Sequence, residues 1–430
     1  MAISGRFVLL AAAGVVAVLL FPGSTALWLW AAFLCAAAGV DVLAAASPRA
    51  LTLQRTEPVS VRLTEPATVL LTVRNGSRRT LNGWFRDGWQ PSAGAVNPVQ
   101  RMHVPAGEAR RFEVQLLPER RGELHSGTVT VRSFGPLGLA ARQRTLRSPA
   151  VLRVLPPFRS KRHLPSKLRR LRELDGNASV QLRGAGTEFD SLRDYVRGDD
   201  VRSIDWRATA RRRDTVVRTW RPERDRRVVL LLDTSRTSAA RIGEEPRLDT
   251  GIEAALLLAM LASGGADRVD FLAFDRRIRA RVSSGAKGNL LNRLVTAMAP
   301  LEAELIEADF SLVPGAVQSV STRRSLVVLI TALDSGALEE GLLPVLPQLL
   351  EKHLVVIASV RDPELEDLRR QRSTASEVFR AAAAERALLD RAAVTAYLRS
   401  MGAEVVDEVP RELPPKLADL YIRLKASGRL

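Results

Sequence analysis

The residues best suited to chemistry lie where an apolar run ends, at residues 228–237. Asp233, Ser235 and Thr237 occupy alternate positions directly after that run. An unbroken apolar run that ends abruptly in polar residues is typical of a buried central strand of a parallel sheet. Ligands bind just beyond the carboxyl ends of such strands, and oxygen-bearing side chains there could converge on one hard cation such as Mg²⁺. The alternative is that Asp233 and Ser235 hydrogen-bond neighbouring loop amides, as polar groups at strand ends often do.

A second polar stretch covers residues 184–221, where acidic residues interleave with arginines. Carboxylates such as Asp199, Asp200 and Asp205 could act as acid and base in a metal-dependent hydrolase. Arginines at this density would instead pair with the carboxylates and keep them ionised, which suits a structural or docking network better than proton transfer. We therefore expect a structural or docking role, with Trp206 among the residues that anchor this stretch against the next domain.

The remaining sequence contains no persuasive catalytic constellation. The single cysteine, Cys35, lies in an apolar segment and excludes both a disulfide framework and a cysteine-based zinc site within one chain. The 4 histidines are scattered without ligand spacing, and neither a Walker A motif nor a G-x-S-x-G motif is present. These observations favour a protein that is not an enzyme.

The formal net charge of +17 is carried mainly by arginine. Such a charge favours an anionic partner, and the inner leaflet of a membrane qualifies as well as nucleic acid does. Arginine enrichment can also reflect genomic composition alone. The basic residues are not interleaved with an aromatic array on a sheet, so nucleic acid is the weakest of the candidate partners.

Two apolar runs, residues 7–21 and 25–46, begin the chain. The second is long enough to span about 30 Å of hydrocarbon, and the first is marginal. A cleaved signal peptide is the alternative for the first run, but a second long run follows at once, which favours a transmembrane helical hairpin. Arg6 precedes the first run and Arg49 follows the second, so the positive-inside rule predicts an inner-membrane protein with cytoplasmic soluble domains. Asp41 could lie at the membrane interface or serve a packing or functional role within the bilayer.

Residues 50–157 show the alternation and the turn signals of short antiparallel strands, which predicts a β-sandwich-like domain. Trp84, Phe85 and Trp89 cluster in the sequence and are expected to pack in a core, with a binding patch as the alternative. A turn at 135–139 carries apolar residues that could pack back on the sheet. The predicted strands lie at 59–63, 68–75, 110–118, 124–135 and 150–156.

Residues 158–226 form a basic linker segment, in which leucines recur at helical spacing up to residue 175. That helix could touch lipid headgroups or pack on the next domain, and we expect the second. From residue 227 to 430 apolar strand patterns alternate with helical ones, which predicts a doubly wound, Rossmann-like α/β domain. The predicted divisions are therefore 1–48 (hairpin), 50–157 (β-sandwich), 158–226 (linker) and 227–430 (α/β domain).

The polar stretch at 184–221 contains a specific pattern of acidic, aromatic, glycine and arginine residues, namely Glu188, Phe189, Asp190, Arg193, Asp194, Tyr195, Gly198, Asp199, Asp200, Asp205 and Trp206. In this signature the sequence resembles the bacterial domain-of-unknown-function family 58, and the resemblance extends from end to end. The paired apolar runs, the turn at 135–139 and the late strand at 228–237 also fit this family. Its members carry a von Willebrand factor A-like domain and are commonly encoded beside MoxR-type AAA+ ATPases.

The resemblance also implies which kind of site the stretch at Asp233 forms. The D-x-S-x-T pattern is similar to the start of a metal-ion-dependent adhesion site, which binds Mg²⁺ and uses an open position to hold an acidic residue of a partner. Such sites need a threonine on a second loop and an aspartate after the fourth strand. The second loop, read at residues 283–289, has no threonine. After the fourth strand Thr331 is followed by alanine, and Asp334 comes two residues later, so the predicted metal site is degenerate.

The sequence therefore favours a membrane-anchored interaction or scaffold protein. The resemblance implies that it works with a MoxR-type ATPase in the assembly or remodelling of envelope or protein complexes. Partner binding is expected at the D-x-S-x-T face, with Mg²⁺ as the candidate cofactor. The alternatives are a metal-dependent hydrolase that uses the acidic cluster and a binder of anionic lipid or nucleic acid.

Overall fold

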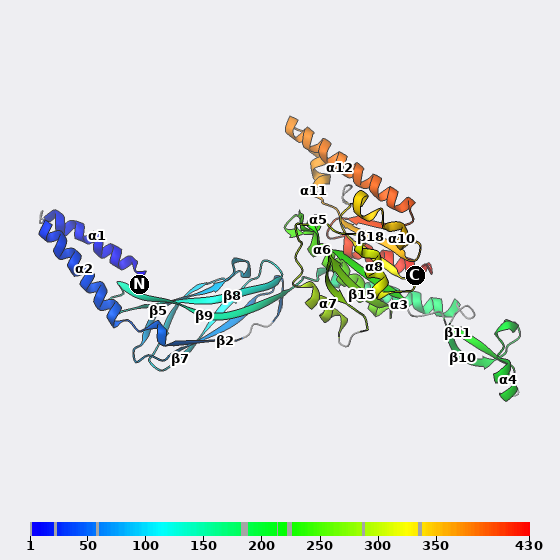
Figure 1. The fold of residues 1–430 in the computed structure, drawn as a ribbon, viewed down its shortest axis with the longest axis horizontal. Helices are drawn as coiled ribbons and strands as arrows, with labels where there is room; N and C mark the ends of the chain where they lie inside the picture. The colour runs from blue at the N-terminus through cyan, green and yellow to red at the C-terminus, as the bar shows by residue number, and fades with distance from the viewer. Residues whose placement is uncertain are drawn as a thin grey trace. The chain divides into compact units, whose positions relative to one another are not determined.

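The chain divides into two compact units, Met1–Pro157 and Phe158–Leu430 (Figure 1). Each unit has a hydrophobic core of its own. The computed structural model describes residues 2–20, 24–56, 60–181, 188–212, 214–221, 226–285, 289–333 and 338–430.

The first unit begins with two apolar helices, α1 (Gly5–Leu20) and α2 (Ser24–Ala44), which lie side by side (Figure 1). A short helix, η1 (Pro48–Ala50), leads from α2 into the β domain. Among the described residues one helical stretch, Ser24–Ala50, is long and apolar enough to cross a membrane, and the apolar part of α1, Gly5–Val16, is shorter. Helices therefore form at both predicted apolar runs, and the second has the length of a membrane span.

The rest of the first unit consists of two sheets whose inner faces share one core. One sheet has the order β1-β9-β8-β5-β6, with β3 also paired to β9, and the other has the order β2-β4-β7. Their pairings are antiparallel except for β3 with β9. The strands are β1 (Ala2–Ile3), β2 (Leu51–Arg55), β3 (Val61–Arg62), β4 (Ala67–Asn75), β5 (Leu81–Trp89), β6 (Val99–Val104), β7 (Ala109–Leu116), β8 (Gly122–Phe134) and β9 (Ala140–Leu155).

The aromatic cluster of β5 belongs mostly to this core. Phe85 and Trp89 are buried, while Trp84 is half-buried and lies beneath the guanidinium of Arg101. The prediction of core packing is therefore confirmed for Phe85 and Trp89.

The second unit is built on a sheet with the order β16-β15-β12-β17-β18-β19. The β16 strand is antiparallel to β15, and the other pairings are parallel. In the register of the central strand, Leu230 lies opposite Phe271 on one side and Val328 on the other. The strands are β12 (Arg227–Asp233), β15 (Arg268–Phe274), β16 (Ile278–Val282), β17 (Leu326–Ile330), β18 (Leu354–Val360) and β19 (Glu404–Glu408).

Helices cover both faces of this sheet, as predicted for a doubly wound domain (Figure 1). The side chains of Val229 and Leu231 join the core beneath α8, α10 and α12, and those of the alternate residues of β12 are buried on the other face, where α6 contacts the strand. Burial on both faces explains the continuous apolar run of β12. The helices are α6 (Arg247–Gly264), α7 (Leu290–Met298), α8 (Leu312–Val320), α10 (Leu346–Leu350), α12 (Ala375–Ser400) and α13 (Leu413–Ala426).

The basic helix of the linker, α3 (Leu164–Gln181), packs on this domain. Its Leu168 and Leu171 side chains lie against the end of α6. Its Lys167 forms an ion pair of 2.6 Å with Asp419 of α13. Of the two alternatives for this helix, packing on the α/β domain is confirmed.

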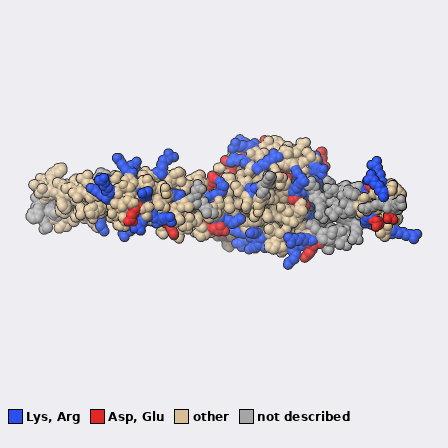
Figure 2. Space-filling model, turned by 90° about the horizontal axis from the view of Figure 1, so that it is seen from below, with Lys and Arg blue, Asp and Glu red and all other residues tan. Residues whose placement is uncertain are grey.

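The basic residues are spread widely over the chain. Figure 2 shows lysine and arginine side chains scattered across the visible face, with fewer acidic ones between them. Among the described residues, this face therefore offers no single continuous basic patch of the kind that tracks a nucleic-acid backbone.

Candidate functional site

Asp233 lies at the carboxyl end of β12, beside the carboxyl end of β17. The chain continues from β12 to β15 on one side, whereas β17 is followed by β18 on the other, so the strand order reverses between β12 and β17. Open α/β sheets bind ligands in the crevice at such a switch point. Thr331 follows the last residue of β17, which brings its side chain beside Asp233.

The hydroxyl groups around Asp233 come from two loops. The Oδ2 atom of Asp233 accepts hydrogen bonds from Thr331 Oγ1 at 2.6 Å and from Thr237 Oγ1 at 3.3 Å. Its Oδ1 atom accepts one from the amide of Ser235 at 2.8 Å. The hydroxyls of Ser235 and Thr237 lie 3.3 Å apart. The structure thus brings together the predicted Asp233, Ser235 and Thr237, and it adds Thr331, which the sequence had suggested only as the remainder of a degraded pair.

The Asp233 carboxyl is almost completely buried, with 1% of the residue exposed. Burial raises the pKa of Asp233, and the hydrogen bonds from Thr331, Ser235 and Thr237 oppose that rise. A buried carboxylate is costly unless an opposite charge or several donors accompany it. A divalent cation at this position would favour the ionised form of Asp233.

The donor set fits a hard cation, because the Asp233 carboxylate and the hydroxyls of Ser235, Thr237 and Thr331 offer the oxygen ligands that Mg²⁺ takes. Mg²⁺ holds its ligands at about 2.1 Å, so two ligands of one ion lie no more than about 4.2 Å apart. The oxygen separations of 2.6 to 3.3 Å satisfy this limit. The predicted fourth ligand, Asp334, lies outside the described residues. Within the described residues no cluster of three or more His, Cys, Asp or Glu could hold a metal, so such a site would depend on one described carboxylate, these hydroxyls and water.

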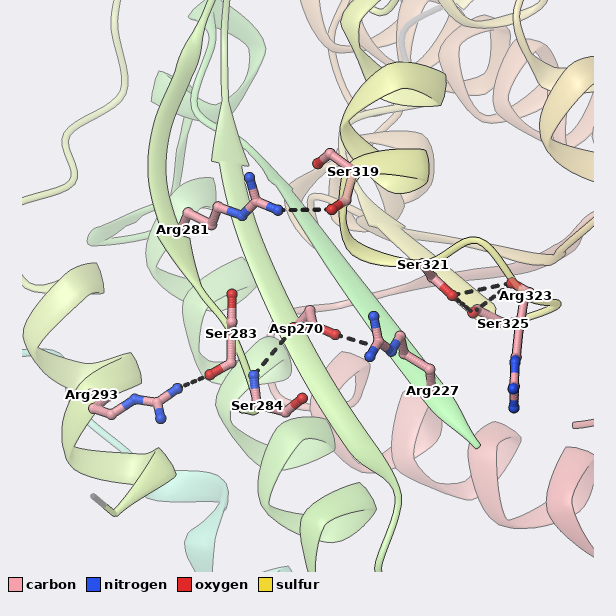
Figure 3. Close-up of polar contacts among 10 residues, drawn as sticks. All are labelled: Arg227, Asp270, Arg281, Ser283, Ser284, Arg293, Ser319, Ser321, Arg323 and Ser325. Atoms are coloured by element: carbon pink, nitrogen blue, oxygen red, sulfur yellow. Dashed lines mark hydrogen bonds and ion pairs between the residues drawn. The ribbon is translucent and has the colours of Figure 1, made fainter. Parts of the chain in front are cut away.

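Ser283 and Ser284, which begin the loop read at 283–289, lie at the opposite edge of the sheet from Asp233, which corrects the reading of this loop as the second loop of the site. Because β16 is antiparallel to β15, it returns the chain to the amino edge. The amide of Ser284 there donates to Asp270 Oδ1 at 3.2 Å, and the other oxygen of Asp270 lies 3.5 Å from Arg227 Nε (Figure 3). The absence of threonine from this loop therefore says nothing about the site.

The loop that reaches the site is residues 299–311, after α7. Its Glu304 amide donates to the carbonyl of Thr234 at 2.8 Å, and its Ile306 carbonyl accepts from the amide of Arg236 at 2.8 Å. Sequence reasoning missed this loop, although the helical pattern that precedes it could have carried the chain back to the carboxyl edge. This loop contains no threonine. Among the described residues, the hydroxyl that reaches Asp233 from beyond its own loop therefore belongs to Thr331, which follows β17.

The signature segment forms an antiparallel β-hairpin with helical turns between its strands. Asp194 ends the first strand opposite Val216, the amide of Tyr195 donates to Thr215, and Gly198 lies in the following turn. For Glu188, Phe189 and Asp190 the structure describes the backbone only. The elements are β10 (Glu188–Asp194), η4 (Val201–Ser203), α4 (Trp206–Arg212) and β11 (Val216–Arg221).

Arginines and backbone amides hold the acids of this hairpin. Asp199 forms an ion pair with Arg193 at 2.5 Å and accepts from the amide of Val196. Asp200 caps η4 by accepting from the amide of Arg202 at 3.0 Å. The hydrogen bond from Arg193 lowers the pKa of Asp199.

Asp205 is held in the same way at the start of α4. It accepts from the amides of Arg207 and Ala208 at 3.0 Å and from Arg218 Nε at 2.8 Å. The bond from Ala208, followed by that from Arg218, lowers the pKa of Asp205. A general acid needs a raised pKa, so this geometry favours the structural interpretation of the acidic cluster.

We predict that the hairpin loses order in acid. The folded pKa values of Asp199 and Asp205 lie below the ordinary 3.8. Their stabilisation is therefore fully present above pH 3.8 and is lost as the pH falls through the folded values. Amide exchange of β10 and β11, corrected for intrinsic rates, should accelerate below that pH. Asp205→Asn should flatten this dependence, and an unchanged profile in that variant would contradict the assignment.

Trp206 does not anchor the segment, contrary to the expectation, because 67% of it is exposed. Val196 and Val201 are also exposed. The described part of the hairpin is therefore held by hydrogen bonds and ion pairs more than by burial of these side chains.

Comparison with solved structures finds likenesses to small β domains. The CARDB domain of the PF1109 protein from Pyrococcus furiosus is 13% identical, with coverage of 24% of this chain and 91% of that one and a TM-score of 0.19. The PapD-like domain 7 of human CEP192 is 12% identical, with coverage of 25% and 88% and a TM-score of 0.18. Likenesses at these scores carry no argument about function.

Sequence comparison is more informative. Uncharacterized proteins of Mycobacterium bovis and Mycobacterium tuberculosis are 28% identical to this chain over 162 residues, which is 37% of this chain and 50% of each relative. The chain thus spans about half the length of the curated relatives it matches. Residues 191–385, from within the signature hairpin to α12, match the family described as protein of unknown function DUF58. This chain is therefore similar to a family of unknown function, in agreement with the resemblance drawn from the signature residues.

Proposed function

We propose that this protein is a membrane-anchored interaction protein whose α/β domain binds a partner at the Asp233 edge of the sheet. Asp233, Ser235, Thr237 and Thr331 would hold Mg²⁺, and an open coordination position would accept an acidic side chain of the partner. When bound, the ion would supply positive charge at this edge of the sheet, while the protein supplies the oxygen ligands and orients them. A MoxR-type ATPase is the partner that the family resemblance suggests, with α2 holding the chain at the cytoplasmic face of the inner membrane.

One observation supports this proposal most directly. A buried carboxylate with a raised pKa meets three hydroxyls at the switch point of the sheet. Burial disfavours the ionised form of Asp233 in spite of its hydrogen bonds, a nearby cation would favour that form, and the donor types match Mg²⁺. In the signature hairpin, by contrast, Asp199 and Asp205 pair with arginines and have lowered pKa values.

Cation binding is the first test. We expect isothermal titration of the full chain in detergent to detect binding of Mg²⁺ and of Mn²⁺, and Asp233→Ala to abolish it because the carboxylate is removed. Asp362→Ala is a matched control, since Asp362 follows β18 at the same edge and accepts a bond from the amide of Glu364. Equal titrations of the wild type and Asp233→Ala would contradict the metal assignment.

The second test separates the role of the hydroxyls from that of the fold. We expect Thr331→Val to weaken cation binding, because valine has nearly the same shape as threonine but offers no ligand oxygen. Ser319→Ala is the control, because the Ser319 hydroxyl donates to the carbonyl of Ala316 within α8, away from the site. Binding by Thr331→Val equal to that by the control would remove Thr331 from the site.

Partner capture tests the proposal as a whole. Pull-down of the full chain from membranes, under conditions that trap an ATPase in its ATP state, should recover an ATPase. Asp233→Ala should lose it and Asp362→Ala should retain it. Recovery of no ATPase by the wild-type chain would count against the partner, and equal recovery by both variants would count against the Asp233 face.

A further inference from the structure

Asp41, the charged residue of the apolar helix α2, is completely buried against the loop between β8 and β9. Its Oδ1 atom accepts from the amides of Leu137 at 2.9 Å and Gly138 at 3.3 Å. Its Oδ2 atom accepts from the amides of Leu139 at 2.6 Å and Ala140 at 2.8 Å. Charge-assisted bonds of this kind compensate for burial of a carboxylate. We call this arrangement of the Asp41 carboxylate and the amides of residues 137–140 the Asp41 latch.

The loop is shaped for this contact. A Cβ atom at Gly135 would lie 2.2 Å from the carbonyl oxygen of Asp41 and 2.3 Å from its Oδ1, so only glycine permits the approach. The other helix is fixed to the same loop, because Ser4 donates from its hydroxyl to the carbonyl of Gly138 at 2.6 Å and from its amide to that of Leu139 at 2.9 Å. Both helices of the first unit are therefore tied to one loop of its β domain.

The latch fixes the depth of this loop relative to the helix. With a rise of about 1.5 Å per residue, the 21 residues of α2 extend over about 31 Å, which matches a hydrocarbon core of about 30 Å. Asp41 lies in the last turn of α2, which ends three residues later at Ala44. The amides of residues 137–140 consequently lie level with the last turn of α2, where an embedded helix meets the lipid headgroups.

The side chains around the latch suit a membrane interface. Ile3, Leu43 and Leu137 are exposed by 65%, 70% and 48%. Apolar side chains at this level would be covered by lipid and not by water. They are accompanied by exposed arginines at the helix ends and in the loop after β4, namely Arg6, Arg49, Arg78 and Arg79.

These arginines are available to an anionic partner. Arg79 donates to the carbonyl of Leu43 at the end of α2. Among the described residues, none of Arg6, Arg49, Arg78 and Arg79 forms an ion pair with a carboxylate. Basic side chains next to exposed apolar ones complement the phosphates and acyl chains of anionic lipid.

We propose that the first unit sits directly on an anionic phospholipid surface, with the loop at 135–139 in the headgroup layer, and that Asp41 is the positioning residue that holds it there. The inference rests on the proposed membrane anchoring and extends it. The helices would then be more than a tether, since they would fix the height of the β domain above the bilayer.

The test uses the full chain with Cys35→Ser, reconstituted into nanodiscs of phosphatidylcholine and phosphatidylglycerol. An environment-sensitive fluorophore is attached at Leu137→Cys. The control is Leu117→Cys, because Leu117 is 50% exposed and thus matches Leu137. Leu117 follows the end of β7 that pairs with Ala67, and this end is far from Leu51 and Asn75, which lie at the helix end of the same sheet. We expect blue-shifted emission and quenching by a headgroup-level spin-labelled lipid at position 137 only. Equal emission and quenching at both positions would overturn the proposal.

Asp41→Leu tests the latch itself. Leucine keeps α2 apolar, so the chain should stay membrane-integrated after carbonate washing while quenching at position 137 falls. Asp41→Asn keeps the side-chain shape but replaces one acceptor by a donor, so it should give intermediate quenching at position 137. Amide protection of β5 and β8 reports whether the β domain remains folded in each variant. Unchanged quenching in Asp41→Leu would remove Asp41 from this role.

Two further measurements, a change of lipid composition and a carbonate wash, distinguish the lipid contact from the membrane anchoring. In nanodiscs of phosphatidylcholine alone, quenching at position 137 should decrease, and equal quenching would contradict the contribution of the arginines. Release of the wild-type chain by carbonate would overturn the membrane anchoring and the lipid contact with it. Retention of the chain with a water-exposed position 137 would overturn only the lipid contact.

Discussion

Asp87→Ala should destabilise the β domain by about 3–5 kcal/mol, the usual cost of breaking a buried ion pair from one side. Asp87 forms a two-pronged ion pair with Arg55, with bonds of 2.8 and 3.0 Å, and both side chains are buried. Asp87 lies on β5 and Arg55 on β2, so the pair joins the two sheets of the sandwich. Its loss would leave a guanidinium in the core without a counter-charge.

Other donors increase the expected effect of the Asp87 substitution. The indole of Trp89 donates to Asp87 Oδ2 at 2.9 Å, and the hydroxyl of Ser126 donates to Oδ1 at 3.1 Å. The Arg55 guanidinium also lies 5.4 Å from the centre of the Trp89 ring. Each of these groups would lose a partner together with Arg55, and buried donors without acceptors are costly.

Hydrogen exchange measured by mass spectrometry gives the test, because the amides of β5 and β8 report on the first unit alone. A change of 3 kcal/mol corresponds to about a hundredfold faster exchange through global opening. Glu123→Ala is the control, since its ion pair with Arg153 spans β8 and β9 at 2.9 Å but is largely exposed. Such pairs contribute about 1 kcal/mol or less. Similar exchange rates in the two variants would contradict the assigned role of Asp87.

The same residue shows why part of the β domain was not predictable from sequence. The strand β5 contains Gly83 and Gly88, and glycine is uncommon in strands, so its sequence predicts an aromatic cluster but no strand. A Cβ atom at Gly83 would lie 1.8 Å from the carbonyl oxygen of Arg132 on β8, so glycine is needed for the close approach of the two backbones. This requirement comes from a strand far away in sequence, which local propensity does not encode.

The α/β domain was more predictable because its strands are buried on both faces. The runs that form β12, β17 and β18 are continuously apolar, and segments with helical periodicity lie between them. The alternation of strand and helix can therefore be predicted from the sequence alone. The antiparallel β16 forms a hairpin with β15. What the sequence did not reveal was the consequence of that hairpin, namely that the following loop lies at the wrong edge of the sheet for Asp233.

The candidate site was predictable to the extent that it is local. Asp233, Ser235 and Thr237 lie within five residues, so their convergence follows from the strand end alone. Thr331 is close to Asp233 only because β12 and β17 are neighbours in the sheet. The Asp41 latch depends on the loop about a hundred residues later, as its bonds to residues 137–140 show, and hydropathy alone left the role of Asp41 open.

Lys425→Met is the second large effect that we expect, again about 3–5 kcal/mol, now in the α/β domain. Lys425 Nζ donates to Asp267 Oδ1 at 3.0 Å and to the carbonyl of Gly265 at 2.9 Å. The hydroxyl of Tyr421 donates to Asp267 Oδ2 at 2.5 Å. Both charged side chains are nearly fully buried, so methionine would leave the Asp267 carboxylate with a neutral donor in place of a cation.

The position of this pair makes the destabilisation global for the second unit. Lys425 lies on α13, while Gly265 and Asp267 connect α6 to β15, so the pair ties two helices to the start of a central strand. Amide exchange in β15 and β18 should accelerate about a hundredfold or more in Lys425→Met. Tyr421→Phe should have a smaller effect, because it removes one hydrogen bond from an uncharged donor and leaves the ion pair intact. Arg386→Met is the control, since its ion pair with Asp390 on α12 is exposed and should contribute less than about 0.5 kcal/mol. A Lys425→Met protein as stable as Arg386→Met would contradict the assigned role of the buried pair, because the substitution leaves the Asp267 carboxylate buried without its counter-charge.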